Sequence, residues 1–490
     1  MPDLICAMDQ GTTGSTVLCM DAFSNVLSRG YCEVHQIYPK PGWVEHDPEN
    51  IWQSMLEALK AAFAQGGAAD VRAIGITNQR ETVVLWDRET GKPYHNAIVW
   101  QCRRTSDMAA RLKSQGLEPL FSQRTGLLLD PYFSGTKIAW MLENVPGLRA
   151  EVRSGKVAAG TIDSWLIFKL TNGASHVTDI TNASRTLLMD LAKGAWDPEL
   201  CRILGVPMEI LPAILPSTEV FGVTHGVSGL PDGIPISGVA GDQQAALFGQ
   251  ACFVPGEAKC TYGTGAFLLK NTGESPVASK NRLLTTVAWK IGKKPVYALE
   301  GSAFIAGAAV QWLRDGLKII KTSPEIEALA ASVPDTLGVT FVPAFVGLSA
   351  PHWRPEARGV ITGLTRGATA AHLARAVLEG IALQNVEILK SMEADSGQKM
   401  ERLKVDGGAS ANNLLMQMQA DLLGCEIVRP KVVETTAMGA AYLAGLGQGL
   451  YKDTGDILKA WRMDRAFTPQ MDESERQAVL ARWREAVQKA

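Results

Sequence analysis

The sequence is poor in the features that mark several classes of protein. Its 8 cysteines are scattered through 490 residues without a CxxC pair, which favours reduced, mostly core-filling thiols over disulfides or a zinc site. No run approaches the roughly 18 apolar residues needed to span a bilayer. The N-terminus also lacks the basic and apolar segments of a signal peptide. We therefore expect a cytoplasmic protein without membrane insertion.

A strong charge of one sign is missing as well. The 48 basic and 50 acidic residues leave a net charge of −2, and no long basic tract occurs. Nothing electrostatic therefore favours nucleic acid or an anionic membrane as a partner. With 46% hydrophobic and 20% charged residues, the composition is that of an ordinary globular protein. A length of 490 residues predicts two or three domains rather than one core.

Two common nucleotide-binding motifs, GxxxxGK[ST] and GxGxxG, do not occur, so neither a P-loop nor a Rossmann site is supported. The chain opens instead with two expected strands, 4–8 and 16–20, around the turn Asp9-Gln10-Gly11-Thr12-Thr13-Gly14. Glycines let backbone N–H groups approach an anion, and threonine hydroxyls add donors. Asp9, at the strand end, is suited to hold Mg²⁺ through water.

The second half repeats this pattern, with expected strands at 258–262 and 267–270 around Gly263-Thr264-Gly265. Each turn alone is most often an ordinary β-turn, but its recurrence in both halves favours phosphate binding. A third glycine turn, 406–412, leads into an expected helix that ends at Leu423. Amides at a helix N-terminus suit a nucleotide, and a helix C-cap with a tight turn is an equally good explanation.

Helical patterns alternate with these strands. Asp47 and Pro48 are typical of the cap and first position of a helix, and apolar residues then recur every four positions. A longer helix is expected around 372–392. This alternation predicts an α/β fold with mixed sheets.

The two similar halves predict two related domains. Pro255-Gly256 interrupts the chain, and we place the boundary near 249–255, with domains 1–249 and 250–490. Because no flexible or low-complexity linker occurs, the halves are expected to contact each other closely and to hinge.

Two further polar segments are candidates for chemistry. Asp242 follows an expected strand at 236–240 and lies beside the domain boundary, where a carboxylate could act as a base. Structural aspartates are also common at such turns. Arg80 and Glu81, between two expected strands, could offer donors and an acceptor to neighbouring hydroxyls, and a solvated loop is the alternative.

In order and spacing these segments resemble the FGGY carbohydrate kinase family, and within it the members that phosphorylate glycerol. The resemblance covers nearly the whole chain. Its most specific stretches are 37–48, 77–82, 100–105, 130–137 and 241–249. No single stretch would settle the resemblance, but five long ones occur in register.

The resemblance implies a ribonuclease-H-like fold of the actin and hexokinase type in each domain, with the active site in the cleft between them. It implies ATP mostly on the C-terminal domain, glycerol on the N-terminal one, and Mg²⁺-assisted in-line transfer that yields sn-glycerol 3-phosphate in glycerol catabolism. Family members are often dimers or tetramers, so it also implies a homo-oligomer.

Site residues follow from the resemblance position by position. Asp242 corresponds to the catalytic base, and Asp9 and Asp242 would lie near Mg²⁺ and bind it directly or through water. The implied glycerol contacts are Arg80, Glu81, Tyr132, Asp242 and Gln243, with Trp100 and Phe267 covering the carbon backbone. The implied phosphate and nucleotide contacts are Thr12, Thr13, Gly14, Thr264, Gly307, Gln311, Gly408 and Asn412.

The sequence departs from the family pattern in places. Thr16 stands where the pattern usually has an arginine that reaches a phosphate, and we expect either weaker nucleotide binding or another cation in that role. Some bacterial members bind the inhibitor fructose 1,6-bisphosphate through a loop with Lys and Arg. The corresponding loop, 225–233, has neither, so we predict that this regulation is absent. His225 is interpreted as an exposed loop histidine. His352 and Arg354 replace the more usual Tyr and Asp, with no consequence evident from the sequence.

Two alternatives remain. A kinase of another polyol or sugar would share the fold, although a larger sugar would need a roomier pocket than the implied contacts leave. A non-catalytic ATP-binding switch would also share it, but a switch needs neither Asp242 nor a pocket for a second substrate.

Overall fold

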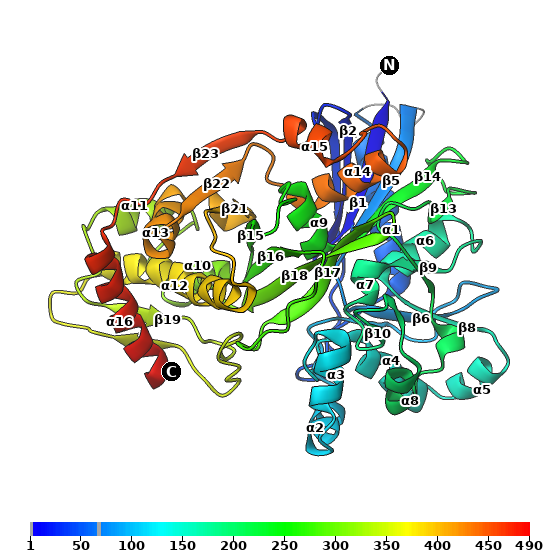
Figure 1. Cartoon of the computed structure of the whole chain (residues 1–490), viewed down its shortest axis with the longest axis horizontal. Coiled ribbons are helices and arrows are strands. Elements are labelled where there is room, and N and C mark those ends of the chain that lie inside the picture. Colours follow the sequence, from blue (N-terminus) through cyan, green and yellow to red (C-terminus); the bar gives the residue numbers. More distant parts are fainter. Residues whose placement is uncertain (1–2, 66–69) are drawn as a thin grey trace.

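The structure is a computed structural model that describes residues 3–65 and 70–490; Met1 and Pro2, at the start of the expected N-terminal domain, lie outside this part. Each half of the chain builds its own mixed β-sheet with helices around it (Figure 1). The expected two-part α/β fold is thereby confirmed.

The first sheet has the strand order β13-β14-β5-β1-β2-β3. Its strands are β1 (Leu4–Gln10), β2 (Gly14–Asp21), β3 (Val26–Glu33), β5 (Val71–Asn78), β13 (Gly222–Val223) and β14 (Pro235–Gly241). β1 and β2 form the predicted hairpin, whereas β1, β5 and β14 run parallel to one another. Because parallel strands end at the same edge, the residues after β1, β5 and β14 meet there.

The second sheet has the order β17-β18-β16-β15-β21-β22-β23. Its strands are β15 (Ala258–Tyr262), β16 (Ala266–Gly273), β17 (Leu284–Ile291), β18 (Lys294–Ala303), β21 (Arg402–Asp406), β22 (Glu426–Pro430) and β23 (Met463–Phe467). β15 and β16 form the second predicted hairpin, and β15 runs parallel to β21. The two glycine turns of this half, after β15 and after β21, therefore lie at one edge of the sheet.

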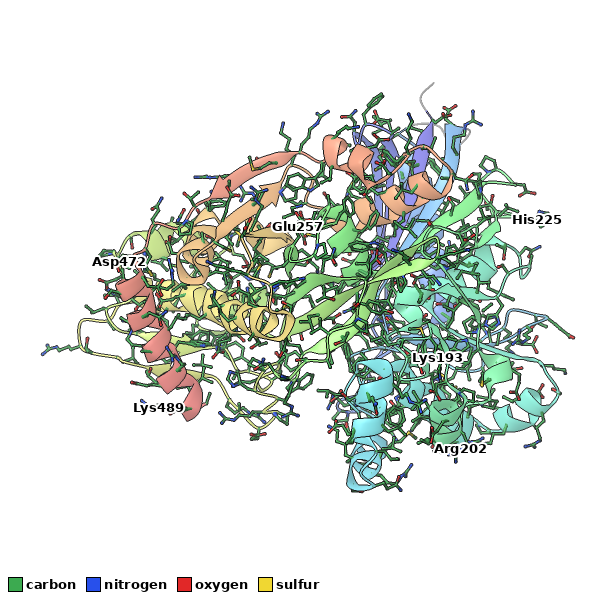
Figure 2. The ribbon with its side chains drawn as sticks, viewed as in Figure 1. Lys193, Arg202, His225, Glu257, Asp472 and Lys489 are labelled. Atoms are coloured by element: carbon green, nitrogen blue, oxygen red, sulfur yellow. The ribbon has the colours of Figure 1, made fainter. Side chains whose placement is uncertain are left out.

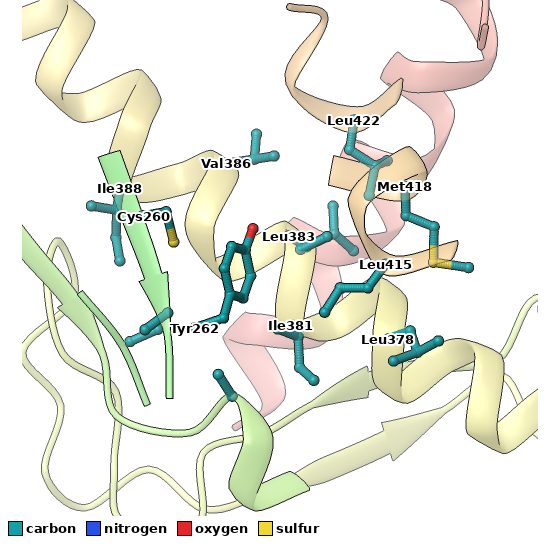
Figure 3. Packing of buried hydrophobic residues seen from close by; sticks show 14 of the residues in the cluster. Cys260, Tyr262, Leu378, Ile381, Leu383, Val386, Ile388, Leu415, Met418 and Leu422 are labelled. Carbon is teal, nitrogen blue, oxygen red and sulfur yellow. The ribbon is translucent and has the colours of Figure 1, made fainter. Parts of the chain in front are cut away.

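Helices cover the sheets with their apolar faces. Helix α1 (Pro48–Phe63) lies on the first sheet and begins as predicted, with the Asp47 side chain accepting a hydrogen bond from the Glu49 amide at 2.9 Å. On the second sheet, α12 (Ala370–Ser396) and α13 (Asn413–Leu423) meet the buried side chains of β15. Figure 3 shows Tyr262 and Cys260 facing these two helices. Seven of the eight cysteines are buried, so the prediction that they mostly fill the core is confirmed.

Two helices lie between the halves. Helix α9 (Asp242–Gly249) follows β14 directly, and α14 (Thr435–Gly447) comes from late in the sequence. Although α14 belongs to the second half by sequence, it lies on α9 and on β1, β5 and β14 of the first sheet (Figure 1).

The smaller elements complete the two halves. A four-stranded sheet, in the order β4-β7-β6-β8, comprises β4 (Glu45–His46), β6 (Val83–Asp87), β7 (Ala97–Ile98) and β8 (Val157–Thr161). Three strand pairs are β9 (Val177–Asp179) with β12 (Ala213–Leu215), β10 (Met189–Asp190) with β11 (Ala195–Trp196), and β19 (Thr340–Val342) with β20 (Val360–Thr362). Further helices of the first half are α2 (Ser106–Ser114), α3 (Glu118–Thr125), α4 (Ser134–Asn144), α5 (Leu148–Arg153), α6 (Ile162–Leu170), α7 (Ile180–Ala183), α8 (Pro198–Leu204) and η2 (Met208–Ile210). Those of the second half are α10 (Gly307–Gln311), η3 (Trp312–Gly316), α11 (Glu325–Ala331), η4 (Gly408–Ala411), α15 (Thr454–Ala460) and α16 (Glu473–Lys489).

Candidate active site

Three charged residues meet at the edge where the parallel strands of the first sheet end. Asp9 lies near the end of β1, Arg80 follows β5, and Asp242 follows β14 and begins α9. Arg80 Nε lies 3.0 Å from Asp242 Oδ1. Burial and the charge of Asp242 together raise the pKa of Asp9 to about 7. Residues far apart in sequence thus form one acidic site with a guanidinium beside it.

The turn that carries Arg80 and Glu81 has an unusual backbone. The Thr82 amide donates to the Arg80 carbonyl at 2.7 Å, and Glu81 between them has φ +61°, as in a strained γ-turn. Such conformations cost free energy and persist where the surroundings fix them, often at active sites. Here the buried Lys137 of α4 donates to the carbonyl oxygens of Glu81, at 3.4 Å, and of Tyr132. Burial lowers the pKa of Lys137 to about 7.

A buried cluster of four charges surrounds this turn. Both terminal nitrogens of Arg80 bind Glu300 of β18, at 2.6 and 3.0 Å. Arg185 donates to Glu300 at 3.0 Å and to Glu81 at 2.8 Å. All four side chains are at most 2% exposed. Burial by itself raises the pKa of Glu300, but Arg185 and Arg80 outweigh it and hold that pKa below its ordinary value.

Sequence reasoning missed Glu300 and Arg185. Neither lies in a glycine turn or in one of the long motifs, and their partners are more than 100 residues away in the chain. The available signal was a lone carboxylate within the otherwise uncharged stretch Pro295–Ala303 of an apolar strand. Lys137 and Lys259, both fully buried, were not singled out either, although Lys137 lies within the stretch 130–137.

Aromatic rings stand beside the charges. The ring of Trp100 lies 5.6 Å from that of Tyr132 and 6.3 Å from that of Phe267, measured between centroids. Trp100 Nε1 donates to Thr12 Oγ1 at 2.9 Å, and Arg80 Nη2 donates to the Tyr132 hydroxyl at 3.4 Å. Phe267 comes from β16, so this wall joins side chains of both halves. It supplies the apolar faces that the carbon backbone of a small polyol would need.

The start of α9 presents two polar side chains. The Asp242 side chain is 28% exposed, and burial raises its pKa even though Arg80 and Lys259 act against this. Lys259 of β15 donates to the side-chain oxygen of the next residue, Gln243, and to Thr261 Oγ1 at 2.8 Å. A carboxylate with a raised pKa is a better proton acceptor than an ordinary aspartate.

Three of the eight residues expected at the phosphates and nucleotide, Thr264, Gly307 and Gly408, lie in or against the glycine turns of the second half. The Ala306 amide donates to the Thr264 carbonyl at 2.8 Å, and the Gly307 amide donates to the Gly263 carbonyl at 3.0 Å. Gly408 lies in the exposed turn after β21, whose neighbour Gly407 has φ +83° and would clash with Tyr262 if it carried a Cβ. This close approach requires glycine.

Two nucleotide candidates are placed differently from the rest. The Asn412 side-chain oxygen accepts from the Leu415 amide at 2.9 Å and so caps α13, which leaves its amide group as a donor. Gln311 lies exposed at the end of α10, where the helix passes into the π-helix η3. In the first half, Thr12 and Thr13 lie between β1 and β2, where Gln36 Nε2 donates to the Thr12 carbonyl at 2.7 Å.

A metal ion would have few protein ligands here. Among residues 3–65 and 70–490, no group of three or more His, Cys, Asp or Glu side chains could hold one. Asp9 and Asp242 are close enough for each other's charge to matter, and two carboxylates with water molecules form a donor set that Mg²⁺ accepts. The residues present therefore fit this ion.

The departures from the family pattern have local structural partners. His225 is 64% exposed at the outer edge of the first half (Figure 2), and its Nδ1 lies 3.0 Å from Asp232 Oδ2. His352 lies 3.1 Å from Glu387 of α12, and Arg354 donates to the carbonyl oxygens of Val487 and Ala490 at the end of α16. His352 and Arg354 thus join segments of the second half.

In the described part of the chain, no helix is both long and apolar enough to cross a membrane.

The chain belongs to the FGGY family of carbohydrate kinases, whose N-terminal domain matches residues 4–249 and whose C-terminal domain matches residues 258–447. It is 57% identical over 492 residues to the glycerol kinase of Myxococcus xanthus and 55% identical over 489 residues to glycerol kinase 2 of Thermotoga maritima. These alignments cover 99% of the chain and 99% and 98% of the relatives.

Solved structures agree with this assignment. The structure of Plasmodium falciparum glycerol kinase with ADP has a TM-score of 0.93 at 40% identity, over 99% of this chain and 98% of that one. A xylulose kinase from Lactobacillus acidophilus, with a TM-score of 0.87 at 23% identity over 98% and 97% of the two chains, shares the fold.

Proposed function

We propose that this protein is an ATP-dependent kinase that phosphorylates glycerol to sn-glycerol 3-phosphate and releases ADP. The observation that carries the proposal is similarity along the whole length, at 57% identity, to a curated glycerol kinase. The grouping of Arg80, Asp242 and an aromatic wall supports it, because a small polyol needs polar partners on one side and apolar cover on the other.

The acceptor contacts that we propose use this grouping. Arg80, Tyr132 and Gln243 provide donors to the hydroxyls, Glu81 and Asp242 provide acceptors, and Trp100 and Phe267 cover the carbon atoms. The Arg80 Nε–H supports this assignment: it is buried and makes no aligned hydrogen bond, although Asp242 lies 3.0 Å away. A buried donor without a partner is costly, so a hydroxyl that accepts from it would be bound favourably.

Asp242 is the proposed base. It takes the proton of the terminal hydroxyl while that oxygen bonds to the γ-phosphorus and the bond from phosphorus to the β,γ-bridging oxygen breaks. Its raised pKa suits this role. Closure of the two halves over the reactants would exclude water, which competes as a phosphoryl acceptor.

The nucleotide is proposed to lie on the domain 250–490, opposite the domain 1–249 that holds the acceptor. Asp9 and Asp242 would hold Mg²⁺, either directly or through water. That ion would neutralise charge on the phosphates. The residues proposed to bind phosphates and nucleotide are Thr12, Thr13, Gly14, Thr264, Gly307, Gln311, Gly408 and Asn412. We also propose a cytoplasmic homo-oligomer, either a dimer or a tetramer.

The decisive experiment measures ADP release with Mg-ATP and glycerol, dihydroxyacetone, erythritol, xylulose or ribulose, with Asp242→Asn assayed alongside. Fastest turnover with glycerol, lost in the variant, is expected. Faster turnover with another polyol would reassign the acceptor and leave the base in place. ATP binding without polyol-dependent turnover would favour a switch.

A further inference from the structure

Glu300 is a buried acid on the strand of the second sheet that reaches towards the first half of the chain. In the β18 register it lies between Leu269 of β16 and Leu284 of β17, two apolar residues. A carboxylate is rarely buried in such a strand unless cations compensate its charge. Both of its cationic partners, Arg80 and Arg185, come from the first half.

The contacts of Glu300 determine the orientation of the Arg80 guanidinium group. The carboxylate binds both terminal nitrogens of the guanidinium, at 2.6 and 3.0 Å, which is a two-point fork that fixes the plane of the group. The same two nitrogens also donate to Gln244 Oε1 at 3.3 Å and to the Tyr132 hydroxyl at 3.4 Å. The Nε–H therefore remains without an aligned partner, and Nε lies 3.0 Å from Asp242 Oδ1. Arg185 holds Glu300 in turn, and it also binds Glu81.

We propose that Glu300 is a positioning residue for the acceptor. From the second half of the chain it orients Arg80, which binds the acceptor. The inference rests on the proposed function, since it assigns Arg80 to the acceptor pocket. Without the carboxylate, only the longer hydrogen bonds to Gln244 and Tyr132 hold the two-nitrogen fork of Arg80, which can then turn towards the neighbouring carboxylate of Asp242. The donor edge would then no longer face the position of the acceptor hydroxyl.

Contacts other than this carboxylate also join the two halves. Neutral hydrogen bonds also tie the β17 strand to the first half, with Thr286 Oγ1 2.8 Å from Ser184 Oγ and 3.2 Å from Gln244 Nε2. The Thr285 amide donates to the Gly126 carbonyl at 2.9 Å. We therefore expect neutralisation of Glu300 to change the orientation of Arg80 while the other hydrogen bonds keep the two sheets together.

The test uses the full-length protein and the variants Glu300→Gln, which keeps the shape, and Glu300→Asp, which keeps the charge. The matched control is Glu426→Gln, which removes another Glu–Arg pair of the same sheet, Arg402 Nε to Glu426 Oε2 at 2.6 Å, outside the site. For each protein we would measure the glycerol KM, kcat, the Kd for ADP, and thermal unfolding.

We expect Glu300→Gln to raise the glycerol KM at least tenfold, with the ADP Kd within twofold of wild type. Glu300→Asp should recover part of this loss, and Glu426→Gln should leave the KM unchanged. In an Arg80→Lys background, which has no fork to orient, Glu300→Gln should have less than a third of its effect on the KM.

Three results would overturn the proposal: an unchanged glycerol KM in Glu300→Gln, an equal effect in the Arg80→Lys background, or parallel losses of ADP binding and thermal stability. Failure of the proposed function is separate, because it appears in the wild type. If the wild type prefers another polyol, the same variants are compared with that acceptor; if it phosphorylates none, both proposals fail.

Discussion

Gly249 of α9 and Gly439 of α14 lie against each other where these two helices cross between the halves of the molecule. A Cβ built on Gly439 would lie 1.8 Å from the Ala245 carbonyl oxygen and 3.0 Å from the Gly249 nitrogen. The backbones therefore touch without side chains between them. Because α9 begins at Asp242, this crossing also positions the helix that carries the proposed base.

Replacing Gly439 should consequently damage the fold. We expect Gly439→Ala to lower the free energy of unfolding by about 2 kcal/mol or more, since overpacking of a rigid contact typically costs 1–3 kcal/mol. Chemical denaturation would measure this. Gly367→Ala is the control, because its Cβ would come no closer than 3.3 Å to Leu337 Cδ2, the end of a side chain that can move. Equal stability of both variants would contradict the close contact.

Local features of the fold were predictable from the sequence. The glycine turns of both hairpins, the Asp47 cap of α1 and the strand before Asp242 depend on neighbours in the chain, so residue type and spacing reveal them. The candidate polar residues at strand ends could be named for the same reason. Their meeting at one edge follows from the parallel pairing of β1, β5 and β14.

Features that depend on distant partners could not be predicted. The Arg80–Glu300 pair joins residues 220 positions apart, and nothing near either residue indicates the other. The packing partner of α14 could not be predicted either. Its sequence has apolar and small residues on every face of the helix, which predicts burial but not the sheet against which the helix is buried. The structure also assigns a role to Arg354, which holds carbonyl groups at the end of α16.

The position that lacks the family arginine can be tested directly. Thr16 of β2 is paired with Asp9 of β1, so the two side chains lie on the same face of the hairpin. We expect Thr16→Arg to lower the KM for ATP roughly twofold to fivefold, the gain of one partly exposed charge contact. Steady-state kinetics at saturating glycerol would measure it.

The control for this change is Thr16→Gln, which adds length without charge and should leave the KM for ATP as it is. A KM that is unchanged or raised in Thr16→Arg would show that the cation does not act on the nucleotide at this position.

Fructose 1,6-bisphosphate should not inhibit the enzyme. The loop at 225–233 offers no Lys or Arg, and its Gly226 amide already donates to Asp232 Oδ1 at 2.7 Å. A carboxylate in this place repels an anionic ligand. Initial rates should be the same with and without the sugar bisphosphate at millimolar concentration, and thermal unfolding should not shift. A response at micromolar concentration would refute this.

The protonation of the buried His46 should make the free energy of unfolding depend on pH. Its Nε2 lies 2.9 Å from Gln36 Oε1 and its Nδ1 lies 3.3 Å from Gln79 Nε2, which suits a neutral ring that donates once and accepts once. Burial lowers the pKa of His46 to about 4, so between pH 6.5 and 4 the unfolded chain binds a proton that the folded chain refuses.

The free energy of unfolding should therefore fall as the pH drops through this range, by at most about 3 kcal/mol from His46 alone. In His46→Gln this contribution disappears, so urea unfolding of the variant should depend less on pH, even if its stability at pH 7 is lower. His225→Gln, at an exposed site, should leave the wild-type slope unchanged. If the slope of His46→Gln equals that of the wild type, the ring is protonated in the folded protein and its two glutamine contacts must rearrange in acid.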